Sequence, residues 1–315
     1  ETSLATGVNM NSQSRPGSLP RAAAVIAAAI AAAPFLYGYY GLAKASFLSA
    51  DVLAVNLTNL ISSLVYRTGL VFLIVLWHGE QRGQLAFRRP ALLLTIYASC
   101  LVGWEIAQRL MFEALIRHLN DGSAMLNFIV TIISLLNVVL YALVAWLTWR
   151  FITHMLRKDA LPLAPPANAR RRIAGLAAWM FATVLLSFMT QATPMLLDYF
   201  DDDLKLVMFD YIGTVAVPTA LVFAGAMLGL PRNLSRLHGW RLLGASLAAM
   251  ASVSLLAYGA LRLLGNVPGT VNPMSGMLIV TLLAGIGVAH RMWFRVFYAA
   301  APRPAAEISP GAQSS

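Results

Sequence analysis

The chain has 315 residues, of which 59% are hydrophobic and only 11% are charged, and its formal net charge is +10. A soluble domain usually carries about 25% charged residues, and several apolar runs here reach the roughly 20 residues that span a bilayer. This composition excludes a soluble globular protein, and the single cysteine, Cys100, excludes a disulfide framework. The basic residues gather at the ends of the apolar runs, so the positive charge indicates membrane topology and no nucleic-acid partner.

Eight apolar segments follow one another along the chain. We expect transmembrane helices at residues 21–40, 52–77, 91–115, 124–151, 173–197, 206–230, 240–264 and 274–290. The first segment also resembles a signal peptide, because Arg21 precedes its apolar core and an A-x-A sequence follows at 43–45, but its length favours a retained span. The predicted fold is an all-α integral membrane protein with eight transmembrane helices.

The segments outside these spans divide the chain. The polar stretch 1–20 and the Ala/Pro/Ser-rich stretch 299–315 are expected to be disordered tails. Between the fourth and fifth spans lies a basic, Pro-rich stretch, 156–172, which we interpret as a cytoplasmic linker. It would separate a first four-helix membrane unit, 21–155, from a second one, 173–298.

The distribution of basic residues predicts the orientation. Eight spans place both termini on one side, and most of the 23 Lys and Arg residues fall on that side. Only Lys44, Arg117 and Lys205 fall in the segments of the other side. Cytoplasmic segments carry the excess of Lys and Arg, so both termini are predicted to be cytoplasmic, in a bacterial-type inner (cytoplasmic) membrane.

The two halves of the chain resemble each other at an offset of about 150 residues. Residues 68–72 then match 219–223, and Arg109 matches Arg262. We interpret this as a duplication of four spans. An even number of spans makes the two repeats parallel, and a transport pathway in such a protein runs between them.

Ionised side chains inside spans are the strongest functional signal in this chain. Each costs roughly 2.5–3.5 kcal/mol at a helix centre, so such groups are paired or functional. A rise of about 1.5 Å per residue places Arg67 and Glu105 roughly 10 Å apart in depth. Their side chains lean toward each other, because each points to the N-terminus of its own helix. We therefore predict an ion pair between Arg67 and Glu105, with Glu105 as the main candidate for a titrating group.

The repeat predicts a second layer of polar contacts, Asn59 with Arg109 in the first half and Asp210 with Arg262 in the second. The predicted pathway or coupling residues are thus Arg67, Glu105, Arg109, Asp210, Arg262 and Asn59. Two interpretations stay open. The charges either clamp neighbouring helices in register, or they act on a solute.

Other motifs predict structure more than chemistry. The acidic residues Asp198, Asp201, Asp202 and Asp203 are a weak candidate metal site, and a solvated acidic loop is the favoured interpretation. The G-x-x-x-G sequence at 225–229 and the glycines at 285 and 287 predict close helix contacts. The aromatic segments 146–151 and 292–298 are interpreted as belts at the membrane interface. No pattern predicts a cofactor or a catalytic residue.

Three functions remain after these exclusions. The first is a small transporter or flippase-like protein, not an enzyme, for an anionic solute or lipid headgroup. The second is a non-catalytic membrane subunit or sensor that scaffolds a membrane or cytoplasmic partner protein, with a basic inner surface suited to anionic lipid. The third is a metal-dependent lipid-modifying enzyme that uses the acidic loop.

Overall fold

The computed structural model describes residues 18–44, 49–118, 124–161, 168–200, 203–234, 236–264 and 273–299. Within these ranges, the side chains of residues 42, 43, 50, 51, 112, 115–118, 124–135, 261, 263, 264 and 273–276 are not described. The predicted disorder is wrong for residues 18–20 and for Ala299, which belong to helices. The rest of both tails, and the Pro-rich part of the linker, lie outside the described residues.

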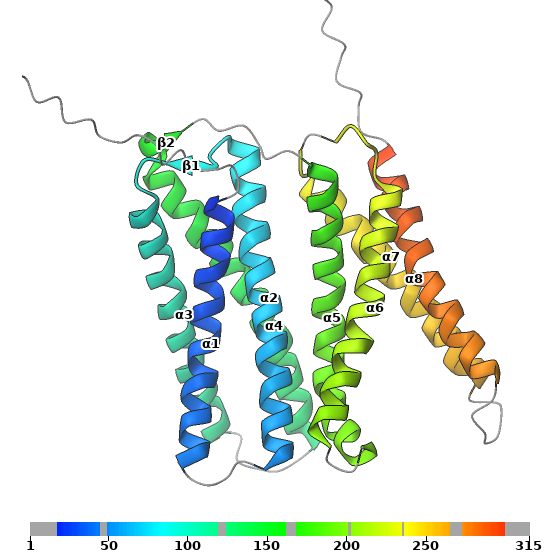
Figure 1. Cartoon of the computed structure of the whole chain (residues 1–315). Coiled ribbons are helices and arrows are strands. Elements are labelled where there is room, and N and C mark those ends of the chain that lie inside the picture. The colour runs from blue at the N-terminus through cyan, green and yellow to red at the C-terminus, as the bar shows by residue number, and fades with distance from the viewer. Residues whose placement is uncertain are drawn as a thin grey trace, which may run out of the picture. The chain divides into compact units, whose positions relative to one another are not determined.

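Eight helices of the described chain are long and apolar enough to cross a membrane, so the protein is an all-α polytopic membrane protein (Figure 1). They are α1 (Ser18–Lys44), α2 (Ala50–Arg82), α3 (Pro90–His118), α4 (Ala124–Met155), α5 (Ala169–Tyr199), α6 (Leu204–Gly229), α7 (Gly239–Leu264) and α8 (Pro273–Ala299). Each predicted span corresponds to one helix. The largest difference is at α8, which continues past the predicted end at residue 290 because Phe294 and Tyr298 still pack as buried residues.

The chain divides into two compact units. The first unit contains Glu1–Ala167 and Thr183–Tyr211, and the second contains Asn168–Ala182 and Ile212–Ser315. The sequence suggested one boundary in the linker, whereas the structure groups parts of α5 and α6 with α1 to α4. Hydroxyl groups explain this grouping, because Thr193 donates to Thr58 Oγ1 (3.3 Å) and Tyr211 donates to the Thr58 carbonyl (3.3 Å).

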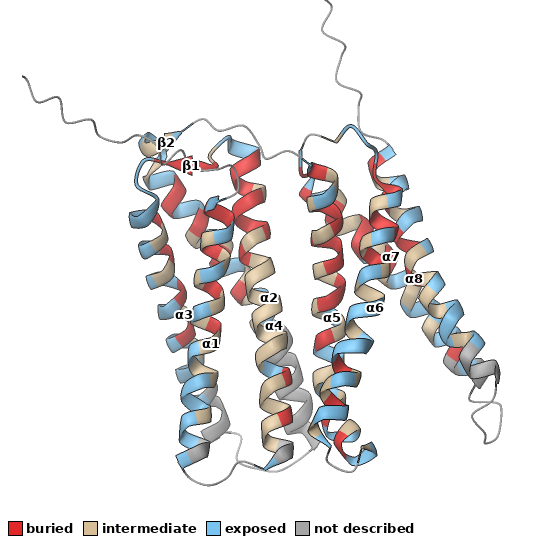
Figure 2. Ribbon diagram, in the orientation of Figure 1, coloured by how far each residue is buried: buried red, intermediate tan, exposed pale blue. Residues whose placement is uncertain are grey.

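The core of the first unit begins with a stripe of alanines on α1. Ala23, Ala27 and Ala31 lie one turn apart and are fully buried, and small side chains let membrane helices approach closely. In this unit α1 packs against α2 and α3, α3 against α4, and α4 against α2. Tyr97 of α3 and Trp149 of α4 meet edge to face at 5.1 Å in the same core. Buried and exposed positions alternate along these helices (Figure 2).

Burial corrects the interpretation of the two aromatic segments as interfacial belts. Phe151 is exposed, as a belt residue should be, but Trp149, Phe294 and Tyr298 have no exposed surface. A helix turns by about 100° per residue, so consecutive aromatic residues point in different directions. Some aromatic residues of these segments therefore pack in the core, and others lie on the surface.

Two short strands, which the sequence did not predict, join the loop after α2 to the segment after α4. Strand β1 (Ala86–Phe87) pairs antiparallel with β2 (Ala160–Leu161), and β2 follows the short 3₁₀ helix Arg157–Asp159. Gly83 permits the turn into β1, because it caps α2 in the left-handed region (φ 66°) that favours glycine. The pairing ties the ends of α2, α3 and α4 together on one side of the unit (Figure 1).

The second unit contains the close helix contacts that the glycines predicted. A Cβ atom at Gly225 of α6 would overlap the carbonyl oxygen of Gly287 of α8, and one at Gly229 would overlap that of Arg291. Trp293 of α8 donates to the Ser252 hydroxyl of α7 (2.9 Å). Glycine is thus required where the backbones of α6 and α8 touch.

A buried hydrogen bond gives a stability prediction for the first unit. His78 Nε2 of α2 lies 3.1 Å from the Thr153 hydroxyl of α4, and both residues are buried. Thr153→Val should lower the free energy of unfolding by about 1–3 kcal/mol, because it leaves the imidazole without this partner. Denaturation in mixed detergent micelles measures the effect, and Thr148→Val on the same helix is the control with little expected change. An equal effect of the two substitutions would contradict the assignment.

Candidate functional site

The predicted contact between Arg67 and Glu105 is present in the first unit. Arg67 Nη1 of α2 donates to Glu105 Oε1 of α3, and the two side chains are only 14% and 11% exposed. Charge-assisted pairs of this kind are the stronger hydrogen bonds in proteins. Neither residue lies at a helix end, so the pair is held inside the membrane-spanning part of the unit.

Tyr141 of α4 completes the surroundings of this pair. The Arg67 guanidinium lies over the Tyr141 ring, 5.0 Å from its centroid, in a cation–π arrangement. The Tyr66 ring packs against Tyr141 at 5.9 Å, and its hydroxyl donates to the Val138 carbonyl (2.6 Å). These contacts link α2, α3 and α4 around one guanidinium.

Arg67 also lines a cavity of about 770 Å³ in the same unit. Ligand pockets in proteins commonly measure about 300–1,000 Å³. The described lining residues are Phe35 of α1; Asn59, Ser62, Ser63, Tyr66 and Arg67 of α2; Asn137, Val138 and Tyr141 of α4; and Thr183, Val184, Ser187, Phe188 and Gln191 of α5. Glu105 is not among them, so Arg67 borders the cavity and its carboxylate partner does not.

The lining is mainly apolar but contains several polar groups. It contains three amides, those of Asn59, Asn137 and Gln191, each from a different helix. Among the described residues none of these amides forms a hydrogen bond within the protein. Uncompensated polar groups are costly in apolar surroundings, so their grouping around one space favours a polar or hydrated occupant.

Aromatic rings form the apolar part of the same wall. Phe35 and Phe188 line the cavity together with Tyr66 and Tyr141. A cavity with apolar walls and a few convergent polar groups is typical of sites for small molecules. Its ligand would combine hydrogen-bonding groups with an apolar portion.

The other predicted site residues have different positions. Asn59 lines the cavity, but no hydrogen bond joins it to Arg109 in the described structure, and Arg109 is exposed on α3. The guanidinium of Arg262 donates to the Tyr258 hydroxyl of its own helix (2.8 Å) and lies 5.2 Å from that ring. Asp210 belongs to the first unit and Arg262 to the second, so their pairing stays a prediction.

The acidic loop has a structural role at one position. Asp203 Oδ1 accepts from the backbone N–H of Lys205 (2.9 Å), which caps α6. Asp198 borders a smaller hollow of about 350 Å³ beside Asn56 and Pro194. Asp201 and Asp202 lie outside the described residues. Within the described part of the chain, no group of three or more His, Cys, Asp and Glu side chains has the arrangement of a metal site.

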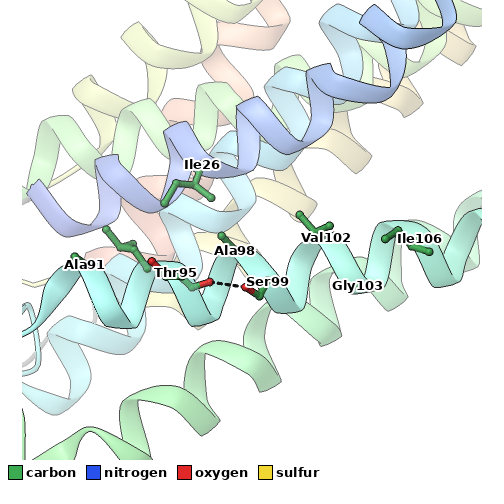
Figure 3. Close-up of a pocket in the computed structure, with 9 residues that line it drawn as sticks. Ile26, Ala91, Thr95, Ala98, Ser99, Val102, Gly103 and Ile106 are labelled. Carbon is green, nitrogen blue, oxygen red and sulfur yellow. Dashed lines mark hydrogen bonds between the residues drawn. The ribbon is translucent and has the colours of Figure 1, made fainter.

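A third hollow, of about 680 Å³, runs along the surface between α1 and α3 (Figure 3). Small residues of α3 form its floor, among them Thr95, Ser99 and Gly103, and Ile26 of α1 forms one edge. The Ser99 hydroxyl donates to the Thr95 carbonyl (3.0 Å), so this polar group is satisfied within its own helix. The hollow offers a smooth surface for lipid or another helix and no charged group.

The ion pair and Asn59 were predictable from the sequence, whereas most of the cavity lining was not predicted. A signal was present, because polar residues recur one turn apart on three helices. They are Asn59, Ser63 and Arg67 on α2; Asn137 and Tyr141 on α4; and Thr183, Ser187 and Gln191 on α5. A spacing of four residues places each set on one helical face.

The assignment of a function to this site depends on its geometry. No protein-family model, curated protein or solved structure matches this chain.

Proposed function

We propose that the protein is a small membrane carrier, a transporter or flippase-like protein, that binds an anionic solute or lipid headgroup in the cavity of the first unit. The observation that carries this proposal is the position of Arg67. It is a largely buried guanidinium that lines a cavity of about 770 Å³, with several polar groups beside it, inside membrane-spanning helices. Intramembrane ionisable residues commonly mark substrate pathways.

The chemistry of the cavity supports binding and no bond-making step. Its groups are amides, hydroxyls, rings and one guanidinium, and none of these forms a nucleophile–base pair. We therefore propose a non-enzymatic role. The charge distribution supports an inner-membrane protein with cytoplasmic termini, and the repeat supports a second helical half of related origin.

Obstruction of the cavity tests the proposal. Ser187 is an exposed residue of the cavity wall, and Ser187→Trp should fill part of the space. A library of anionic solutes and short-chain lipids is screened by thermal unfolding of the purified protein. A ligand at about 100 times its Kd should stabilise the wild type by about 2.7 kcal/mol, and the variant should lose most of that stabilisation.

Ser99→Trp is the matched control, because Ser99 is an exposed serine on α3 outside the cavity. It should keep the full ligand response. Compounds that pass the screen are then tested for uptake into proteoliposomes. Equal stabilisation of the wild type and Ser187→Trp, or the absence of any stabilising compound, would contradict the proposal.

A membrane subunit that scaffolds a partner is the second candidate function. The specific observation in its favour is the hollow of small residues on α3, since such surfaces let a second helix approach closely. Affinity purification in mild detergent distinguishes the two functions. Stoichiometric recovery of one partner, lost in Ser99→Trp, would favour the scaffold.

A further inference from the structure

The Arg67 guanidinium has hydrogen-bonding capacity that the protein does not use. It carries five N–H donors, and among the described residues only Nη1 donates, to Glu105. The same side chain lines the cavity, whereas Glu105 does not. One face of the guanidinium is thus held by a carboxylate, and further donors are available to a ligand. Oxyanions such as carboxylate, sulfonate and phosphate are the groups that match a guanidinium.

The charge balance of the pair restricts how an anion can bind. One positive and one negative charge now neutralise each other in a site that is largely closed to water. An added anion would leave one uncompensated negative charge, which is strongly unfavourable in a low-dielectric environment. The site can regain neutrality if Glu105 accepts a proton, because two carboxylate-like groups that compete for one cation cannot both stay ionised.

Within the described part of the chain, no other ionisable group is placed to compensate the charge. From α2 Arg67 contacts Glu105, and from α4 the Tyr141 ring lies under the Arg67 guanidinium. On α1, the basic residues Arg21 and Lys44 lie at the two ends of the helix. On α3 itself Arg109 follows one turn later, but its side chain is exposed. Glu105 is therefore the group in which a proton would restore neutrality.

We infer that an oxyanion binds in the cavity to the Arg67 guanidinium and that its binding is coupled to the uptake of one proton by Glu105. The proton comes from the solvent, the hydrogen bond from Arg67 to Glu105 opens, and new hydrogen bonds form from Arg67 to the oxyanion. The net charge of the site is zero before and after binding. This inference rests on the proposed function, and it makes the carrier an anion–proton symporter.

Benzenesulfonate is the probe, because its sulfonate keeps one negative charge at every pH where the protein is folded, so any proton taken up must enter the protein. Binding to the purified full-length protein is measured by titration calorimetry in two buffers with different ionisation enthalpies. The wild type should take up one proton per ligand. Its affinity should weaken by about tenfold per unit of pH increase over the range in which one proton is taken up.

Three comparisons make the test specific. Benzenesulfonamide, the neutral isostere, should bind with no proton uptake. Glu105→Gln should bind benzenesulfonate with no proton uptake and with an affinity independent of pH. Glu113→Gln, which removes an exposed glutamate two turns along α3, should retain the uptake of one proton.

The outcomes separate the inference from the function on which it rests. Binding of benzenesulfonate without proton uptake, or an unchanged uptake in Glu105→Gln, would overturn the inference and leave the carrier proposal standing. If neither benzenesulfonate nor benzenesulfonamide binds the wild type, the result would count against the cavity as a binding site. It would therefore count against both the inference and the carrier proposal. The wild-type measurement needs no substitution, so it decides the matter even if a variant fails to fold.

Discussion

Replacement of Arg67 by alanine is expected to lower the free energy of unfolding by about 3–5 kcal/mol, because the buried carboxylate of Glu105 loses its partner. The same substitution removes the contact with the Tyr141 ring. It should also abolish binding of an anion in the cavity. Denaturation by SDS in mixed micelles, followed by circular dichroism, measures the stability change.

Arg109→Ala is the control, since this arginine lies one turn from Glu105 but is exposed. A change within about 0.5 kcal/mol is expected there, as for most surface substitutions. The double variant Arg67→Met/Glu105→Leu should recover most of the lost stability, because apolar residues of similar volume can replace a buried ion pair. Equal effects of Arg67→Ala and Arg109→Ala would mean that the pair contributes nothing.

The double variant also separates the two interpretations of the buried charges. If the pair only clamps α2 to α3, a stable apolar replacement should retain ligand binding and transport. If Arg67 binds the solute, the double variant should be folded and inactive. Stability and function are therefore measured on the same protein. The carrier proposal expects a double variant that is folded but inactive.

The second large effect is expected at the crossing of α6 and α8. Gly225→Ala should destabilise the protein by about 1–3 kcal/mol, and Gly225→Leu by more. The reason is that a Cβ atom at this position overlaps the Gly287 carbonyl oxygen, which belongs to the backbone of a helix and cannot move alone. Thermal unfolding in detergent measures the effect.

Gly213→Ala provides the control within α6, because a Cβ atom there meets no neighbouring atom within 4 Å. Alanine is a better helix former than glycine by about 1 kcal/mol. This substitution should therefore be neutral or slightly stabilising, opposite in sign to Gly225→Ala. Destabilisation of similar size at both positions would show that the effect comes from glycine loss in general and not from the helix crossing.

The sequence was sufficient for the spans and for the buried ion pair, for reasons that can be named. A span needs only a long apolar run, and the bilayer requires its backbone to be helical. Arg67 and Glu105 stood out because charge is so costly at these depths that few other arrangements are tolerated. The glycines at 225 and 287 were predictive for a similar reason, because no larger side chain fits at a backbone contact.

The cavity was much harder to predict because its lining residues are individually ordinary. Serine, threonine and amide side chains occur in membrane helices as packing residues, and only Arg67 among the lining residues carries a charge. Tyr141, the partner of the guanidinium on α4, is distinguished in the sequence only by its position one turn after Asn137. The predicted contact between Asn59 and Arg109 failed because equal depth does not imply that two helical faces meet.

Composition and the spacing of apolar residues alone determined that this chain enters a bilayer as eight helices and that Arg67 and Glu105 neutralise each other there. Tertiary structure alone decided that the polar faces of α2, α4 and α5 surround one space and that Arg67, not Glu105, borders it. The physical reason is that the depth of a residue and the rotation of its helix about the helix axis have different origins. Depth follows from the rise along a single helix, whereas the direction in which a face points depends on how every neighbouring helix packs against it.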